Sequence, residues 1–169
     1  MEEAVEPLKE SPEFLTWLKQ SENPWRGSMM GALVTLIIQS SSASVGMAII
    51  LCKKGILSVT GGIAIMLGAE LGTCSDTLLA TIKGSRQALK TGLFHVIFNL
   101  VSIFLGLLLF DPFCTLVLEL SPKAGPEHQL ANAHVIFNSL GVILFVWGIP
   151  WYEKILNKIL PDKPIIYSE

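Results

Sequence analysis

Long apolar stretches alternate with short charged ones along this chain of 169 residues. Charged side chains gather mainly in five regions, namely residues 1–26, 53–54, 83–90, 111–127 and 153–169. Four apolar segments lie between them, at 27–52, 55–82, 91–110 and 129–152. Because a helix needs about 20 residues to cross the hydrocarbon core, segments of this length predict an all-α integral membrane fold.

The lengths and interruptions of the four segments predict different elements. Segment 27–52 can span once, or it can enter as two short helical legs that turn at its serines and form a re-entrant helical hairpin. Segment 55–82 carries internal glycines and acids, which predicts a broken helix. Segments 91–110 and 129–152 read as plain transmembrane helices. Asp111-Pro112 closes the first, and aromatic residues anchor the second at an interface: Trp147, Trp151 and Tyr152.

The residues before and after these segments are expected to lie outside the membrane core. Ser11-Pro12-Glu13 is a helix start, and the apolar residues that follow it share one face, so residues 1–26 are predicted to be an amphipathic, interfacial segment. Residues 161–169 are predicted to be a C-terminal tail. The chain is expected in the cell (plasma) membrane, with lipid as a partner.

Lysine and arginine placement leaves the topology open. A hairpin at 27–52 divides the basic residues six and six between the two sides, whereas a single span divides them nine and three. The positive-inside rule prefers the single span. Clustered serines in mid-segment favour the hairpin, because irregular backbone is tolerated where it lines a cavity.

Composition supports the membrane setting and excludes some functions. Apolar residues make up 51% of the chain and charged residues 15%, against about 25% charged in soluble domains. The net charge is −2, and no basic stripe with interleaved aromatics appears, so no nucleic-acid partner is expected.

The most unusual feature is a run of polar side chains at residues 39–44, inside a segment that has no charge. A buried hydroxyl or amide costs roughly 1–3 kcal/mol when it is left unpaired. These side chains must therefore face partners, water or a ligand.

Residues 68–77 form a second candidate site. Glycines there favour an unwound or closely packed backbone, and the neighbouring hydroxyls, carbonyls and carboxylate are the oxygen donors that a small cation prefers. The alternative is a glycine-packed helix whose acids reach toward an interface. That alternative suits Asp76, whereas the deeper Glu70 is expected to be functional or paired.

The pentapeptide His-Val-Ile-Phe-Asn occurs twice, at His95–Asn99 and His134–Asn138. Histidine and asparagine four residues apart lie on one helix face, so each copy is expected to bond helices together. A role in ion or proton handling is the alternative.

These motifs together resemble the type II sodium-phosphate cotransporter family. The resemblance rests on Gln39-Ser40-Ser41-Ser42-Ala43, on the Gly-Ala-x-x-Gly-Thr stretch at 68–73, and on the two His-x-x-Phe-Asn helices. It implies two inverted repeats, each with one Gln-Ser-Ser-Ser hairpin, whose tips meet around phosphate and sodium. This chain carries one copy, so residues 27–160 resemble a single repeat, the C-terminal one, which is half of an inverted-repeat transporter.

The resemblance also implies the site residues. The residues implied to bind substrate are Gln39, Ser40, Ser41 and Ser42. The residues implied to bind sodium are Gln39, Ser42, Gly68, Glu70, Gly72, Thr73 and Ser75. Glu70 departs from the family pattern, which has asparagine there. Sodium is expected as the coupling ion, with no other cofactor and no transition metal, and the second half of the site is expected from a homodimer or another repeat-bearing chain.

Three functions are considered. The first is sodium-coupled symport of inorganic phosphate, with this chain as one half, which would not make it an enzyme. The second is a structural or regulatory membrane subunit that does not transport. The third and least favoured is an intramembrane serine hydrolase with His95 or His134 as the base.

Overall fold

The computed structural model describes residues 11–82 and 84–161, and these residues form only helices. Ten elements follow one another along the chain. In order they are α1 (Pro12–Lys19), η2 (Gln20–Glu22), α2 (Pro24–Ile38), α3 (Ser41–Lys53), α4 (Val59–Ile82), α5 (Arg86–Leu108), α6 (Phe110–Leu120), α7 (Pro126–Phe145), η3 (Val146–Gly148) and α8 (Ile149–Ile159).

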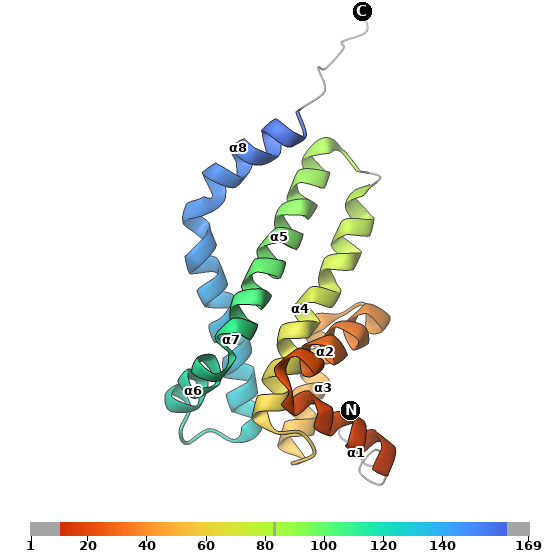
Figure 1. Cartoon of the computed structure of the whole chain (residues 1–169), viewed down its shortest axis with the longest axis vertical. Helices are drawn as coiled ribbons and strands as arrows, with labels where there is room; N and C mark the ends of the chain where they lie inside the picture. The colour runs from red at the N-terminus through yellow and green to blue at the C-terminus, as the bar shows by residue number, and fades with distance from the viewer. Residues whose placement is uncertain (1–10, 83, 162–169) are drawn as a thin grey trace, which may run out of the picture.

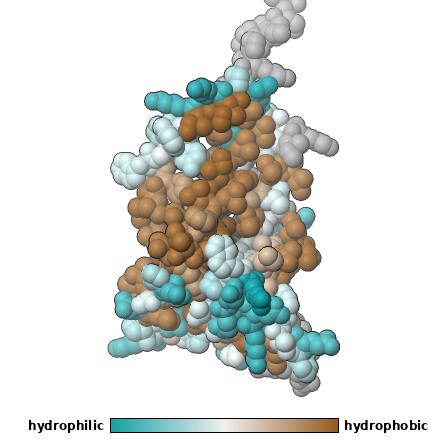
Figure 2. Space-filling model, in the orientation of Figure 1, coloured by the Kyte–Doolittle hydropathy of each residue, from teal (hydrophilic) through white to brown (hydrophobic). Residues whose placement is uncertain are grey.

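Three long helices set the height of the molecule, and the shorter ones gather at its two ends. Helices α4, α5 and α7 run roughly along the long axis, while α1, α2, α3 and α6 lie around the lower half and α8 crosses the top (Figure 1). Within the described part of the chain, the segments long and apolar enough to span a membrane are Val59–Leu79, Arg86–Leu108 and Pro126–Ile159. An apolar surface covers the middle of the molecule, and hydrophilic residues lie at both ends (Figure 2).

The core forms around the first half of α4, which is enclosed by α2, α3 and α7. Ile63, Met66 and Leu67 of α4 are completely buried, as is Leu130 of α7. The Cδ methyls of Leu130 and the sulfur of Cys52 in α3 both lie against Gly62 of α4. The three elements therefore meet over one small residue.

The N-terminal helix begins as the sequence predicts. The Ser11 hydroxyl accepts a hydrogen bond from the Phe14 amide at 3.3 Å, and Pro12 occupies the first turn. Helix α1 is amphipathic, and its Leu18 is buried in the core, with only 3% of its surface exposed. Residues 1–10 of the predicted interfacial segment lie outside the described residues, as do 162–169 of the predicted tail.

The prediction of a broken helix at 55–82 is wrong, because α4 is continuous over 24 residues. Its glycines serve close packing against α2 instead of unwinding the backbone. A Cβ on Gly68 would lie 1.8 Å from the Ser28 carbonyl oxygen, and one on Gly72 would lie 2.5 Å from the Thr35 Cβ. Small residues of this kind let two backbones approach closely within a membrane.

Two predicted boundaries also change. Asp111-Pro112 follows the end of α5 as predicted, but the charged region after it contains another helix, α6, with Asp111 and Pro112 in its first turn. Proline and aspartate are both favourable in a first turn, so the same dipeptide stops one helix and starts the next. The plain helix predicted at 129–152 ends at Phe145, and the chain bends through η3 into the amphipathic α8, which carries Pro150 in its first turn.

Candidate functional site

The serines of segment 27–52 lie at a tight turn between two short helices. Helix α2 ends at Ile38, Gln39 adopts the left-handed conformation (φ 60°, ψ 31°), and Ser40 is extended before α3 begins at Ser41. The Gln39 amide donates to the Thr35 carbonyl at 2.6 Å, which closes the last turn of α2. The chain thus reverses within two residues, both of them members of the polar run.

Hydrogen bonds within the turn divide its polar residues into two groups. Ser40 caps α3, because its hydroxyl accepts from the Ala43 amide at 3.3 Å. The buried Ser44 hydroxyl donates to the Ser40 carbonyl at 3.1 Å and accepts from the Thr35 hydroxyl of α2 at 2.8 Å. Ser40, Ser44 and Thr35 therefore stabilise the turn.

The remaining polar residues of the turn face outward to differing degrees. Gln39 and Ser42 are exposed, and Ser41 is half-buried. The backbone amides of Ser41 and Ser42 lie at the N-terminus of α3, where the first N–H groups of a helix have no intrahelical acceptor and the helix dipole favours an anion. This end of α3 can therefore present hydroxyls, amides and a side-chain carboxamide to one small ligand.

Helix α4 carries the second predicted group of site residues next to this turn. Helices α2 and α4 run side by side in the same direction, because Gly27 of α2 contacts Ala64 of α4 and Thr35, further along α2, contacts Gly72. Gln39 follows Thr35 by one helical turn, which is ~6 Å of rise. The serine turn therefore lies close to Gly72 and to the helical turn that follows it, near the middle of α4.

The two hydroxyl groups predicted to bind sodium from α4 form hydrogen bonds within their own helix. The Thr73 hydroxyl donates to the Ala69 carbonyl at 3.2 Å, and the Ser75 hydroxyl donates to the Gly72 carbonyl at 2.7 Å. Each hydroxyl oxygen still has acceptor lone pairs after it has donated its proton. The backbone carbonyls, in contrast, lie within a continuous helix. The side chain of Asp76 lies outside the described residues.

Glu70 of α4 contacts His134 of α7. Its Oε1 lies 2.8 Å from Nε2 of His134 on α7, and the two side chains are 13% and 32% exposed. The sequence predicted that Glu70 would be functional or paired, and it predicted that His134 would join helices, but it did not predict that they join each other. An acid in a membrane segment needs a hydrogen-bonding partner, which is the signal that could have suggested the pair.

The two copies of the repeated pentapeptide behave differently. In the first, His95 Nε2 lies 2.9 Å from Asn99 Nδ2 within α5, and Asn99 is buried. In the second, Asn138 donates to the His134 carbonyl at 3.0 Å, which leaves the His134 ring for Glu70. The second copy thus joins α7 to α4, as expected. The first copy also joins two helices, because the Asn99 side chain bonds to the Cys74 thiol of α4 as well as to His95.

Comparison with known proteins identifies the family. The sequence pattern of the Na+/Pi-cotransporter family matches residues 1–113, which include the serine turn and α4. The chain belongs to this family. The family is a family of transporters, and three helices within the described residues are long and apolar enough to span a membrane, so the chain is a membrane protein. Of the two histidines considered as a hydrolase base, His134 contacts Glu70 and His95 contacts Asn99.

Individual relatives give the same picture. The uncharacterized protein YqeW of Bacillus subtilis is 29% identical over 85% of this chain and 46% of its own length. Sheep sodium-dependent phosphate transport protein 2A is 32% identical over 48% of this chain and 14% of its own. The putative inorganic phosphate export protein YjbB of Escherichia coli is 26% identical over 81% of this chain and 25% of its own.

The chain spans less than half the length of these relatives. No solved structure matches it.

Proposed function

We propose that this chain supplies one half of a sodium-coupled symporter of inorganic phosphate, with the serine turn as its contribution to the substrate site. The proposal is supported chiefly by the position of the turn, since Thr35, one helical turn before Gln39, packs against Gly72 near the middle of the candidate membrane helix α4. Membership of the Na+/Pi-cotransporter family supports phosphate as the substrate.

The dimensions of α2 and α3 support a re-entrant pair. Their 15 and 13 residues are each short of the roughly 20 needed to span, whereas the 24 residues of α4 are enough. Since α2 follows α4 in the same direction and α3 returns, the turn would lie at about mid-depth with both outer ends on one side. Irregular backbone at that depth is stable where it lines a polar cavity.

Phosphate recognition would use neutral donors. The hydroxyls of Ser41 and Ser42 and the first amides of α3 can donate to phosphate oxygens, while Ser40 holds the turn and Gln39 adds its carboxamide. Neutral donors leave most of the charge of the anion unbalanced. Phosphate would therefore bind well only when a cation accompanies it, and that dependence is the thermodynamic basis of coupling.

Sodium would bind between the turn and α4. The Gln39 carboxamide oxygen and the hydroxyl oxygens of Ser42 and Ser75 are the proposed ligands, since each keeps lone pairs in the observed arrangement. Thr73, two residues before Ser75, faces another side of the continuous α4 and would take part only if the helix opened locally. Glu70 would add negative charge one turn away while its Oε1 stays with His134. The carbonyls near Gly68 and Gly72 would take part only if α4 opened locally.

The second half of the site would come from another copy or another repeat-bearing chain. Along α2, on the side that α4 leaves uncovered, large apolar side chains are exposed: Met29 (67%), Leu33 (54%), Leu36 (49%) and Ile37 (82%). They recur at the spacing of one helix face. A partner repeat seated there would bring its own turn next to this one.

Labelled phosphate uptake into proteoliposomes containing the purified chain tests the proposal. An inward sodium gradient should drive uptake and an equal potassium gradient should not. Ser42→Ala should lower the uptake by about tenfold or more, because a hydrogen bond to a charged group contributes roughly 1.5–3 kcal/mol. Thr115→Ala, which removes an exposed hydroxyl on α6, is the matched control and should leave uptake unchanged.

Three outcomes distinguish the forms of the proposal. Sodium-driven uptake by the chain alone means that a homodimer completes the site. Sodium-dependent phosphate binding without uptake means that a different chain completes it. Uptake that is equal in potassium, or an absence of both binding and uptake, contradicts the proposal.

A further inference from the structure

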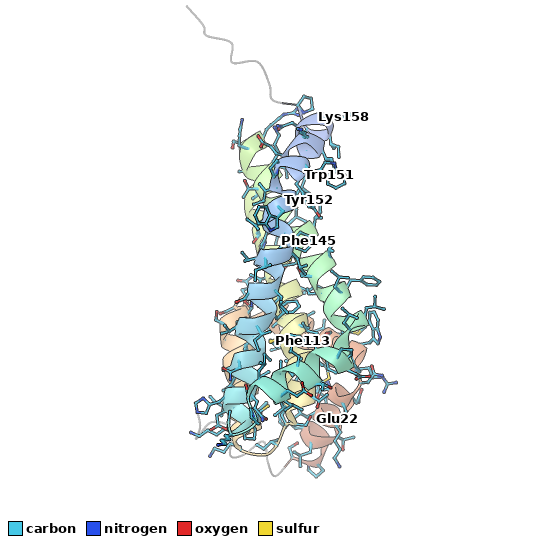
Figure 3. All side chains as sticks on the ribbon, turned by 90° about the vertical axis from the view of Figure 1, so that its left-hand side faces the viewer. Glu22, Phe113, Phe145, Trp151, Tyr152 and Lys158 are labelled. Atoms are coloured by element: carbon cyan, nitrogen blue, oxygen red, sulfur yellow. The ribbon has the colours of Figure 1, made fainter. Side chains whose placement is uncertain are left out.

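Thr35 lies beneath the serine turn, in the last turn of α2, and none of its surface is exposed. Three of its groups make three different contacts. Its carbonyl oxygen accepts from the Gln39 amide at 2.6 Å, its hydroxyl donates to Ser44 of α3 at 2.8 Å, and its side chain packs against Gly72 of α4. One buried residue thus contacts the turn, the helix that follows the turn, and the helix that carries the proposed sodium ligand Ser75. The lower half of the molecule, where these three helices gather, is seen from the side in Figure 3.

The hydroxyl of Thr35 begins a chain of hydrogen bonds that ends at the turn. Thr35 Oγ1 donates to Ser44 Oγ, and Ser44 Oγ donates to the Ser40 carbonyl at 3.1 Å. Because a trans peptide unit is planar, the carbonyl of Ser40 and the amide N–H of Ser41 point in opposite directions. Fixing the direction of that carbonyl therefore fixes the direction of the Ser41 amide, which is one of the proposed phosphate donors.

The methyl group of Thr35 sets the distance between the turn and α4. A Cβ built on Gly72 would lie 2.8 Å from the Thr35 Cγ2 and 2.9 Å from the Ala32 carbonyl oxygen, so the two helices leave no space for a side chain there. The Gly72 carbonyl accepts from the Ser75 hydroxyl at 2.7 Å. The proposed sodium ligand on α4 is thus bonded to the residue against which Thr35 packs.

Threonine is the residue type that makes both side-chain contacts. Its Cβ carries one hydroxyl and one methyl group, whereas valine lacks the donor and serine lacks the methyl. The sequence does not single out Thr35, because a hydroxyl in a helix commonly bonds to its own backbone. Its two contacts depend on how α2 packs against α3 and α4.

We propose that Thr35 is a positioning residue that couples the phosphate donors of the turn to the sodium ligand of α4. It acts through Ser44 and Ser40 on one side and through Gly72 on the other, without touching either ion. This inference rests on the proposed function, because the groups that Thr35 positions are the ones assigned there to phosphate and sodium. A residue that only stabilised the fold would change the two binding constants together, or neither.

Two substitutions separate the hydroxyl from the methyl, with labelled phosphate binding to the purified chain as the measurement. Thr35→Val should weaken phosphate binding at saturating sodium by about fivefold, because the bond to Ser44 is lost. Thr35→Ser keeps that bond and should retain the phosphate affinity at saturating sodium. It should instead raise the sodium concentration that half-saturates binding by roughly twofold to tenfold, as is typical for one lost buried methyl. Thr115→Val, which removes an exposed hydroxyl of α6, should change neither constant.

Hydrogen exchange of residues 39–45, followed by mass spectrometry in detergent without phosphate, tests the positioning itself. Thr35→Val should speed exchange by about fivefold, because the turn loses a buried hydrogen bond. Ser44→Ala removes the same bond from the other side. The double variant Thr35→Val/Ser44→Ala should therefore exchange no faster than Ser44→Ala alone.

The outcomes distinguish this inference from the function on which it rests. If the wild-type chain binds phosphate in sodium, and Thr35→Val and Thr35→Ser change both constants together or leave both unchanged, the coupling role is wrong and the proposed function stands. A wild-type chain that binds no phosphate contradicts the proposed function instead. Hydrogen exchange then still decides whether Thr35 holds the turn, since equal rates in the wild type and Thr35→Val overturn that role.

Discussion

The left-handed backbone of Gln39 is the feature that reverses the chain at the serine turn. Gln39 is the one non-glycine residue with positive φ among residues 11–82 and 84–161. That conformation costs a side-chain-bearing residue roughly 1–2 kcal/mol, and glycine adopts it without the penalty. A glutamine at this position therefore indicates that its carboxamide has a use that outweighs the strain.

Replacing Gln39 by glycine should separate stability from function. We expect Gln39→Gly to raise the free energy of unfolding in detergent by up to about 1 kcal/mol, because the backbone strain is relieved. Phosphate uptake should fall, because the carboxamide is lost. Gln39→Asn keeps an amide that tolerates the left-handed region, and it should retain more uptake than the glycine variant. A glycine variant with full sodium-driven uptake would contradict the role of the carboxamide.

The Glu70–His134 pair should stabilise the contact between α4 and α7. Hydrogen bonds between membrane helices contribute about 0.6 kcal/mol on average and up to about 1.7 kcal/mol. Glu70→Ala should lower the free energy of unfolding by an amount in this range, measured by thermal denaturation in detergent, whereas Glu70→Gln should lower it less because an amide can still bond to His134. Glu119→Ala removes an exposed acid of α6 and should have no effect. Equal losses in Glu70→Ala and Glu119→Ala would contradict the assignment.

At this scale the sequence predicts which residues are unusual better than it predicts their partners. The polar run at 39–44 and the acid at Glu70 stand out because their chemistry conflicts with an apolar surrounding. The bond from Glu70 to His134 joins residues 64 positions apart, so it depends on how α4 and α7 pack. Local patterns hold no information about that packing.

Among the elements, the continuity of α4 differs most from expectation. Glycines at 68 and 72 are compatible with an unwound backbone or with a closely packed helix, and only the presence of α2 decides between them. The Gly68 position shows why, since an added Cβ would lie 1.8 Å from the backbone oxygen of Ser28. The Ser28 hydroxyl also donates to the Ala64 carbonyl at 2.9 Å across the same contact.

A glycine-to-alanine pair measures this packing. Gly68→Ala should lower the free energy of unfolding by about 1–3 kcal/mol, because the methyl group forces α2 and α4 apart. Gly46→Ala in α3 is the matched control, since no atom lies within 4 Å of the Cβ position there, and its helix propensity should make it neutral or slightly stabilising. A Gly68 variant as stable as the Gly46 variant would show that α2 and α4 are not in this close contact.

The ends of the long helices show a second limit of sequence patterns. The apolar segments at 91–110 and 129–152 are correctly predicted as helices. Helix α6, however, lies mainly in the charged region at 111–127, and α8 begins inside the segment predicted as a plain span and continues to Ile159. Each of these two helices begins with a proline in its first turn. Proline marks a change of element, and the packing of the next segment decides whether that element is a loop or another helix.

At the scale of the whole molecule, an apolar middle lies between two hydrophilic ends (Figure 2). The family assignment and the membrane-length helices agree with the expectations from sequence. The second turn that would complete a phosphate site is not present in this chain as a second Gln-Ser-Ser-Ser motif. We therefore propose that the turn is half of a water-accessible, sodium-dependent phosphate site within the membrane.

Protection of a cysteine at position 42 tests that claim most directly. Ser42→Cys would be made in a background in which the buried Cys52, Cys74 and Cys114 are replaced by alanine, and its labelling by a membrane-impermeant maleimide would be followed in proteoliposomes. We predict labelling from water that phosphate slows when sodium is present and does not slow in potassium. Lys123→Cys, at an exposed end, should label at the same rate in every condition. A Ser42→Cys variant that does not label, or that phosphate protects equally in potassium, would contradict the account.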